Sequence, residues 1–127
     1  MDFPPSILLI DGYQDDRLLL HRSLREAGRD FQLYQASDGK TGLDLFRTVE
    51  PDCVVMELKL SDMIGMELLN LMKIGTEKPI PIFIWTRLNH AMLRSTASTL
   101  GVSGYFEKTQ GSESQVTRAI LDAFAAR

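Results

Sequence analysis

Four polar side chains that could do chemistry follow or end four separate apolar runs of the sequence. They are Asp11 after SILLI, Glu57 after CVVM, Thr86 at the end of IFIWT, and Lys108 after YFE. If these runs are parallel strands, their carboxyl ends meet at one edge of the sheet, where open α/β sheets bind ligands. Each residue alone is explained well enough as a helix cap or a solvated lysine. Four together favour an acidic pocket that contains one ammonium group.

The apolar runs alternate with segments of helical spacing. This order predicts an α/β fold, in which a parallel sheet with right-handed crossovers carries helices on both faces. Residues 31–36 alternate between apolar and polar side chains, which predicts a more exposed strand near a sheet edge. The predicted strands are 6–11, 31–36, 52–57, 82–86 and 102–106, and the last two helices are expected over 89–100 and 112–126.

Composition narrows the class of protein. The 127 residues are 44% hydrophobic and 24% charged, with a formal net charge of −3, which predicts one domain over residues 1–127 with its own core. The basic residues are scattered, so we expect no direct binding of nucleic acid. No apolar run approaches the ~18 residues of a membrane span, and the start lacks signal-peptide features. We therefore expect a cytoplasmic protein that does not bind membranes.

Five sequence motifs lie in order along almost the whole chain. They are ILLIDGYQDDRLLL, SDGKTGLDLF, PDCVVMELKLSDMIGMELL, IPIFIWT and VSGYFEK. In this order and spacing they resemble the receiver domains of bacterial two-component response regulators. The resemblance implies a flavodoxin-like (βα)5 fold, a doubly wound parallel sheet with strand order 2-1-3-4-5.

The resemblance also implies chemistry for the pocket. In the family, a histidine kinase transfers a phosphoryl group to an aspartate at the position of Glu57, and Mg²⁺ neutralises charge as the group arrives. The implied metal ligands here are Asp11 and the backbone carbonyl of Lys59. The family binds the phosphoryl oxygen with a hydroxyl, pairs the acceptor with a lysine, and swings an aromatic side chain inward as the switch is thrown. The matching residues are Thr86, Lys108 and Tyr105.

Two departures from the family pattern affect the reaction itself. Glu57 replaces the acceptor aspartate, and a misplacement of ~1 Å costs about a hundredfold in rate, so phosphorylation is disfavoured. The longer side chain also imitates a phosphorylated aspartate weakly, with less charge and fewer oxygens than a phosphate. Gly12 replaces the second acid of the family's metal pair and leaves Asp11 as the only side-chain ligand from the first strand. We therefore expect no resident cofactor and only weak affinity for Mg²⁺.

Further charged residues near the pocket have alternative interpretations. Arg87 follows Thr86 where the family has a small residue, and it either pairs with Glu57 or points to solvent. Asp15 and Asp16 are interpreted as helix-start charges in preference to replacements for the missing metal ligand.

These observations leave three hypotheses for function. The first is a phosphorylation-independent receiver, not an enzyme, that binds a histidine kinase or another signalling protein and forms a homodimer through the face of helix 4, strand 5 and helix 5. The second is a working receiver that accepts a phosphoryl group on Glu57 from a histidine kinase. The third is a small flavodoxin-like enzyme or flavin binder, which the absence of a glycine-rich phosphate loop after the first strand disfavours.

Overall fold

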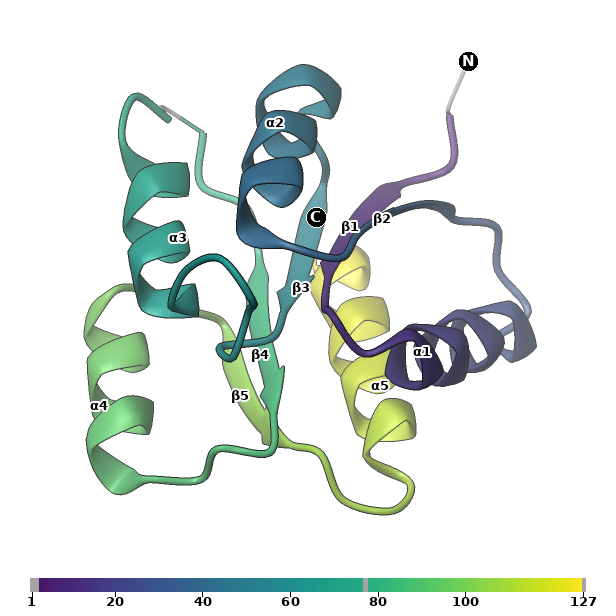
Figure 1. Ribbon diagram of the computed structural model, residues 1–127. Coiled ribbons are helices and arrows are strands. Elements are labelled where there is room, and N and C mark those ends of the chain that lie inside the picture. Colours follow the sequence, from purple (N-terminus) through teal and green to yellow (C-terminus); the bar gives the residue numbers. More distant parts are fainter. Residues whose placement is uncertain (1–2, 77, 127) are drawn as a thin grey trace.

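The computed structural model describes residues 3–76 and 78–126, and within them five strands alternate with five helices (Figure 1). The ends of the predicted 1–127 domain, residues 1, 2 and 127, lie outside the described residues, as does residue 77. The strands are β1 (Ser6–Ile10), β2 (Gln32–Ala36), β3 (Cys53–Met56), β4 (Ile82–Thr86) and β5 (Gly104–Glu107). The helices are α1 (Gln14–Glu26), α2 (Gly39–Val49), α3 (Gly65–Lys73), α4 (Ala91–Thr99) and α5 (Ser112–Ala125).

All pairings in the sheet are parallel, and the strand order is β2-β1-β3-β4-β5, so the predicted flavodoxin-like arrangement is confirmed. β2 lies at one edge, as its alternating pattern predicted, and β5 lies at the other. Parallel order brings every strand's carboxyl end to the same side of the molecule. The residues that follow β1, β3 and β5 therefore meet there, beside the end of β4.

Helices cover both faces of the sheet, with α1 and α5 on one face and α2, α3 and α4 on the other (Figure 1). Alternation along β1 explains this layering: Leu8 and Ile10 belong to the core under α2–α4, whereas Ile7 and Leu9 pack against α1 and α5. All four side chains are fully buried, and burial of each contributes about 1.5–3 kcal/mol.

Small shifts separate some observed element bounds from the predicted ones. The fifth strand begins at Gly104 and not at residue 102, because the Val102 amide still bonds the carbonyl of Ala97 and closes the end of α4. The first and third strands end one residue early, at Ile10 and Met56. The amides of Asp11 and Glu57 nevertheless continue the ladder, donating to Ala36 and Ile10 at 2.9 Å.

The loop between β3 and α3 is fastened to its surroundings at two points. Asp62 accepts hydrogen bonds from the Gly39 and Lys40 amides at 2.8 and 2.9 Å, so it caps the N-terminus of α2, and these bonds lower the pKa of Asp62. Gly65 begins α3 in close contact with the loop's start. A β carbon on Gly65 would lie 2.6 Å from the Leu58 Cα and 2.9 Å from the Glu57 carbonyl oxygen.

No helix in the described part of the chain is both long and apolar enough to cross a bilayer.

We expect Gly65→Ala to lower the free energy of unfolding by about 1–3 kcal/mol, because the atoms that an added methyl meets belong to the backbone. At a helix position with free space around it, Gly→Ala would raise the free energy of unfolding by up to about 1 kcal/mol. The sign of the change in stability therefore shows whether Gly65 is closely packed. Urea unfolding measures the difference. Ser95→Ala, on the exposed side of α4, is the control and should change stability by less than about 0.5 kcal/mol. A Gly65→Ala variant at least as stable as the wild type would contradict the close packing of this loop.

Candidate functional site

The Lys108 ammonium group lies at the centre of a buried cluster of three carboxylates. Its Nζ atom is 2.7 Å from Asp11, 2.9 Å from Asp16 and 2.9 Å from Glu57. The lysine side chain is only 3% exposed. An ammonium group has three N–H donors, so three carboxylates match its capacity. Although burial acts to lower the pKa of Lys108, hydrogen bonds to these carboxylates raise it.

The structure brings together the four residues predicted at the strand ends. Asp11 and Glu57 contact Lys108 directly, and Thr86 closes β4 beside them with its side chain fully buried. Asp11 also accepts a hydrogen bond from the Tyr13 amide at 2.9 Å. Burial raises the pKa of Asp11, and the hydrogen bond from Lys108 only partly offsets this effect.

The extra methylene of Glu57 allows its carboxylate to bend back onto its own loop. One oxygen, Oε2, accepts hydrogen bonds from the amides of Leu58 at 2.7 Å and Lys59 at 3.2 Å. The other oxygen, Oε1, is bound to Lys108. Glu57 is 1% exposed. Both oxygens are therefore already engaged, in a place that solvent does not reach.

Asp16 belongs to this cluster, which its interpretation as a helix-start charge did not predict. It does lie in the first turn of α1, but it is 6% exposed, and it contacts both Lys108 and Arg87. Burial acts to raise the pKa of Asp16, and hydrogen bonds from Arg87 and Lys108 outweigh it and lower the pKa. Asp15 lies in the same first turn, as its interpretation predicted, and is exposed.

Arg87 pairs with Asp16 and not with Glu57, which corrects the predicted pairing. Its two terminal nitrogens lie 2.9 and 3.2 Å from the two Asp16 oxygens, a bidentate geometry. The alternative interpretation placed the guanidinium in solvent. It agrees with the 56% exposure of the Arg87 side chain but did not include the pairing with Asp16. The hydrogen bond to Asp16 raises the pKa of Arg87.

Aromatic rings complete the surroundings of the two cations. Lys108 lies 4.9 Å from the ring centre of Tyr13 and 5.1 Å from that of Trp85, and Arg87 lies 5.2 Å from the ring of Tyr13. Cations are attracted to ring faces at such distances. Tyr13, which is 42% exposed, and Arg87 thus form a cover over the cluster on its solvent side.

A chain of hydrogen bonds connects the pocket to β5. The Leu88 amide donates to the Thr86 hydroxyl oxygen at 3.2 Å, and the Tyr105 hydroxyl donates to the Leu88 carbonyl at 2.5 Å. Arg94 of α4 covers the Tyr105 ring at 4.6 Å and donates to the Tyr105 carbonyl. Burial raises the pKa of the Tyr105 hydroxyl. Tyr105 is therefore held against the loop after β4.

The residues offer a magnesium ion a poor site. Lys108 lies within 2.9 Å of all three carboxylates, so an ion among them would have to share their oxygens with its ammonium group. Gly12 contributes no side-chain ligand, which leaves Asp11 as the only carboxylate directly after β1. The Lys59 carbonyl, the other ligand that the resemblance implied, stays a prediction. In residues 3–76 and 78–126, no group of three His, Cys, Asp or Glu side chains is arranged to hold a metal ion.

Sequence reasoning placed Trp85 beside the pocket but missed Tyr13 and Leu88 as neighbours, and it did not include Asp16 in the cluster. A signal for Asp16 was present: it lies four and eight residues before Leu20 and Leu24, on the buried face of α1. No comparable signal marked Tyr13, because its place over Lys108 depends on the path of the loop after β1.

Comparison with known proteins agrees with this fold. The family model of the response regulator receiver domain matches residues 7–120. Sporulation initiation phosphotransferase F of Bacillus subtilis is 30% identical over 102 residues, which cover 80% of each chain. The signal receiver domain of a putative response regulator NarL from Mycobacterium tuberculosis superposes with a TM-score of 0.85 at 19% identity, covering 99% of this chain and 100% of that one.

Other similar proteins are longer. Transcriptional regulatory protein YdfI of Bacillus subtilis is 30% identical over 103 residues, which are 78% of this chain and 47% of that protein. The chain thus spans about half the length of several curated relatives that it matches.

We expect Asp16→Asn to lower the free energy of unfolding by about 1–3 kcal/mol at neutral pH, because it leaves Lys108 and Arg87 with less compensation. A lowered carboxyl pKa contributes stability above the ordinary value of about 4, and this contribution is lost as the pH falls through the folded-state pKa. The cost of the substitution should therefore shrink in acid. Urea unfolding at several pH values measures it, with exposed Asp15→Asn as the matched control. Equal costs for the two variants, or a cost independent of pH, would contradict the role of Asp16.

Proposed function

The chain belongs to the response regulator receiver domain family, and from this premise we propose that it signals without being phosphorylated. Receiver domains are signalling modules that interact with histidine kinases and other signalling proteins. This one would bind its partner in a single, fixed conformation. The observation that carries the proposal is the Glu57 carboxylate, which is 1% exposed and has both oxygens engaged.

Phosphorylation requires a free carboxylate oxygen in line with the donor's phosphorus atom. Glu57 would have to release either Lys108 or the amides of Leu58 and Lys59 before it could attack. Breaking a buried charge pair costs several kcal/mol, and each 1.4 kcal/mol slows a reaction about tenfold. The cover of Tyr13 and Arg87 adds a steric barrier on the solvent side.

The same contacts give the site an internal substitute for the phosphorylated state. Glu57 extends its negative charge past the strand end and takes up the donors of Lys108 and the following loop. Thr86, Leu88 and Tyr105 are linked by hydrogen bonds, so the pocket and β5 form one continuous unit. We infer that the switch is held in one position and that Mg²⁺ has no part in it.

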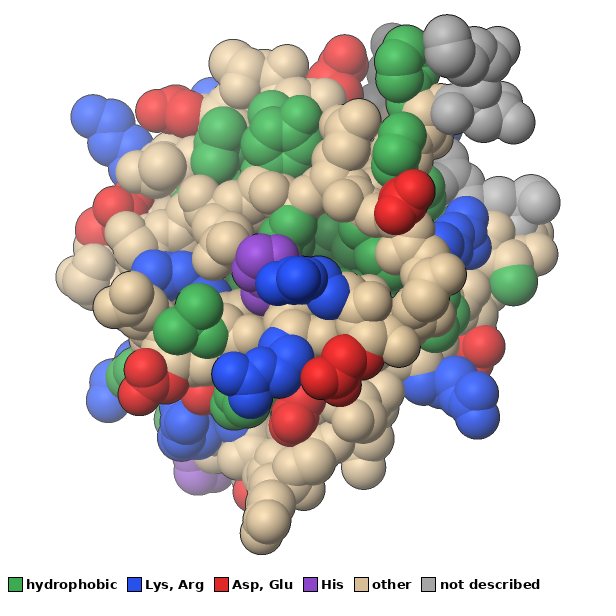
Figure 2. Space-filling view, turned by 90° about the vertical axis from the view of Figure 1, so that its right-hand side faces the viewer, with side chains coloured by type: hydrophobic (Ala, Val, Ile, Leu, Met, Phe, Trp, Pro, Cys, Tyr) green, Lys and Arg blue, Asp and Glu red, His purple; other side chains and the backbone are tan. Residues whose placement is uncertain are grey.

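The partner surface that we propose is the face of α4, β5 and α5, through which the chain binds a signalling protein or a second copy. Only Ala97 of α4 is buried, and Met92 on the same helix is 79% exposed. A protein partner fits better than nucleic acid. The formal net charge of −3 does not suit a phosphate backbone, which favours a basic surface. On a different side of the molecule, the one carrying α1, Lys and Arg side chains are also interspersed with Asp and Glu (Figure 2).

A second candidate function is phosphoryl transfer to Glu57 from a histidine kinase. One observation favours it: the 2.9 Å contact of Lys108 with Glu57 matches the pairing of lysine and acceptor that the family resemblance implied. One relative is also named a phosphotransferase.

Intact mass spectrometry after incubation with acetyl phosphate and Mg²⁺ separates the two candidates. We expect the wild type to keep its mass, because Glu57 is buried and engaged. The double variant Gly12→Asp with Glu57→Asp, which restores both family acids, is the positive control and should gain one phosphoryl group. A wild-type adduct that disappears in Glu57→Gln would overturn the proposal in favour of the second candidate.

A further inference from the structure

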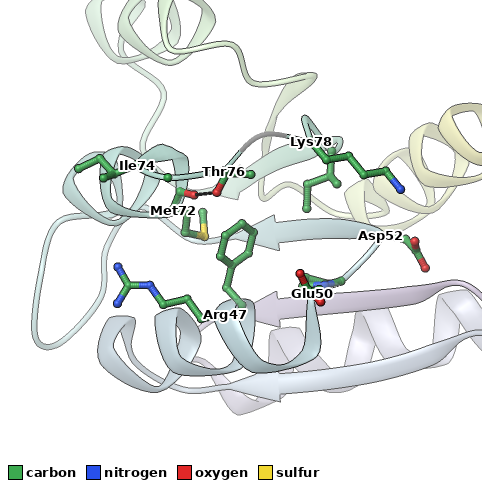
Figure 3. A pocket seen from close by; sticks show the side chains of 11 residues that line it. Arg47, Glu50, Asp52, Met72, Ile74, Thr76 and Lys78 are labelled. Carbon is green, nitrogen blue, oxygen red and sulfur yellow. Dashed lines mark hydrogen bonds between the residues drawn. The ribbon is translucent and has the colours of Figure 1, made fainter.

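A cavity of about 710 Å³ lies on the opposite side of the molecule from Lys108, at the amino edge of β3. It is framed by the C-terminal ends of α2 and α3 (Figure 3). A volume of this size is in the range of small-molecule sites. Nothing in the switch that we propose uses it, so it requires its own explanation.

The floor of the cavity is apolar. Phe46, Met72 and Ile80 line it; Met72 belongs to the core under α2–α4, and Phe46 and Ile80 are partly buried against that core. Ile74 stands on the rim with 71% of its surface exposed. An apolar molecule that covered Ile74 and the floor would gain about 25 cal/mol for each Å² removed from water.

Two cations flank this apolar floor. Arg47 and Lys78 lie on opposite sides of the opening (Figure 3), and both are exposed. Within the described residues, neither has a carboxylate within 4.0 Å. Asp52, which also lines the cavity, is bound to the Ser6 amide and hydroxyl at 2.8 and 3.3 Å. Among residues 3–76 and 78–126, an anionic group would therefore meet a cation without an ion-pair partner on either side of the opening.

Glu50 limits the charge that the site accepts. It ends α2 at a φ of 51°, the one positive φ at a non-glycine position in residues 3–76 and 78–126, and it lines the cavity between the two cations. Backbone strain of this kind costs about 1–3 kcal/mol and is found preferentially at functional sites. Its carboxylate would repel a second anionic group on the ligand.

We propose that this cavity binds an amphipathic monoanion, a molecule with an apolar body of aromatic or aliphatic carbon and one carboxylate or sulfonate group. The body lies over Phe46, Met72 and Ile80, and the anionic group pairs with Arg47 or Lys78. The inference is independent of the function proposed for the Lys108 cluster, because the two sites share no residue.

A matched pair of fluorescent probes tests the proposal on the full chain. Anilinonaphthalene sulfonate carries the anionic group, and phenylnaphthylamine is its uncharged counterpart. We expect saturable binding of one sulfonate probe per chain, about tenfold tighter than that of the neutral probe. Non-saturable binding, or equal affinity for the two probes, would overturn the proposal.

Variants then assign the probe to this cavity. Arg47→Gln with Lys78→Gln should remove the preference for the anion and leave binding of the neutral probe unchanged, which also verifies folding. Ile74→Ser should lower the affinity for both probes about threefold, because it removes apolar surface that either probe would cover. The control, Lys40→Gln with Arg118→Gln, removes the same charge elsewhere and should change neither affinity. A control that weakens the sulfonate probe as much as the cavity variants would show only a general charge effect and reject the site.

Discussion

A lysine ammonium group that is almost completely removed from water is the constraint on which the rest of this structure depends. Isolated, such a charge would cost many kcal/mol and would lose its proton. Here Asp11, Asp16 and Glu57 compensate it at 2.7–2.9 Å, and each carboxylate comes from a different element. The ends of β1, β3 and β5 and the start of α1 are thereby held at one point. Moving one of these carboxylates away would remove one of the three partners of a buried ammonium group.

This arrangement distinguishes the pocket from one whose carboxylate oxygens are open to a ligand. A pocket that binds Mg²⁺ must present carboxylates to an open space. In this chain the lysine fills that space, Glu57 uses its second oxygen on the loop amides, and Arg87 neutralises the outer side of Asp16. Within the described residues, no buried side-chain nitrogen or oxygen atom lacks a hydrogen-bond partner. Our proposal of a fixed signalling state follows from these contacts, since each oxygen of Glu57 is already bound inside the protein.

Much of the fold could be predicted because buried parallel strands leave a clear record in the sequence. Apolar runs such as SILLI and IFIWT, each bounded by a polar residue, identified the strands and hence the edge where Asp11, Glu57, Thr86 and Lys108 meet. The partner of Arg87 could not be predicted, because carboxylates from two elements lie within reach of a long side chain. The bend of Glu57 onto its own loop depends on side-chain torsions that a sequence does not specify.

The protonation of Lys108 is the most direct measure of this account. With ¹⁵N-labelled lysine, NMR follows each side-chain nitrogen through an alkaline titration and through addition of Mg²⁺. Because hydrogen bonds to three carboxylates raise its pKa, the Lys108 signal should stay that of an ammonium group above the ordinary lysine pKa of about 10.4. It should also exchange slowly and stay unchanged when Mg²⁺ is added. A Lys108 signal that titrates at or below that ordinary value, or that shifts saturably with Mg²⁺, would contradict the claim that this lysine is the pocket's own cation.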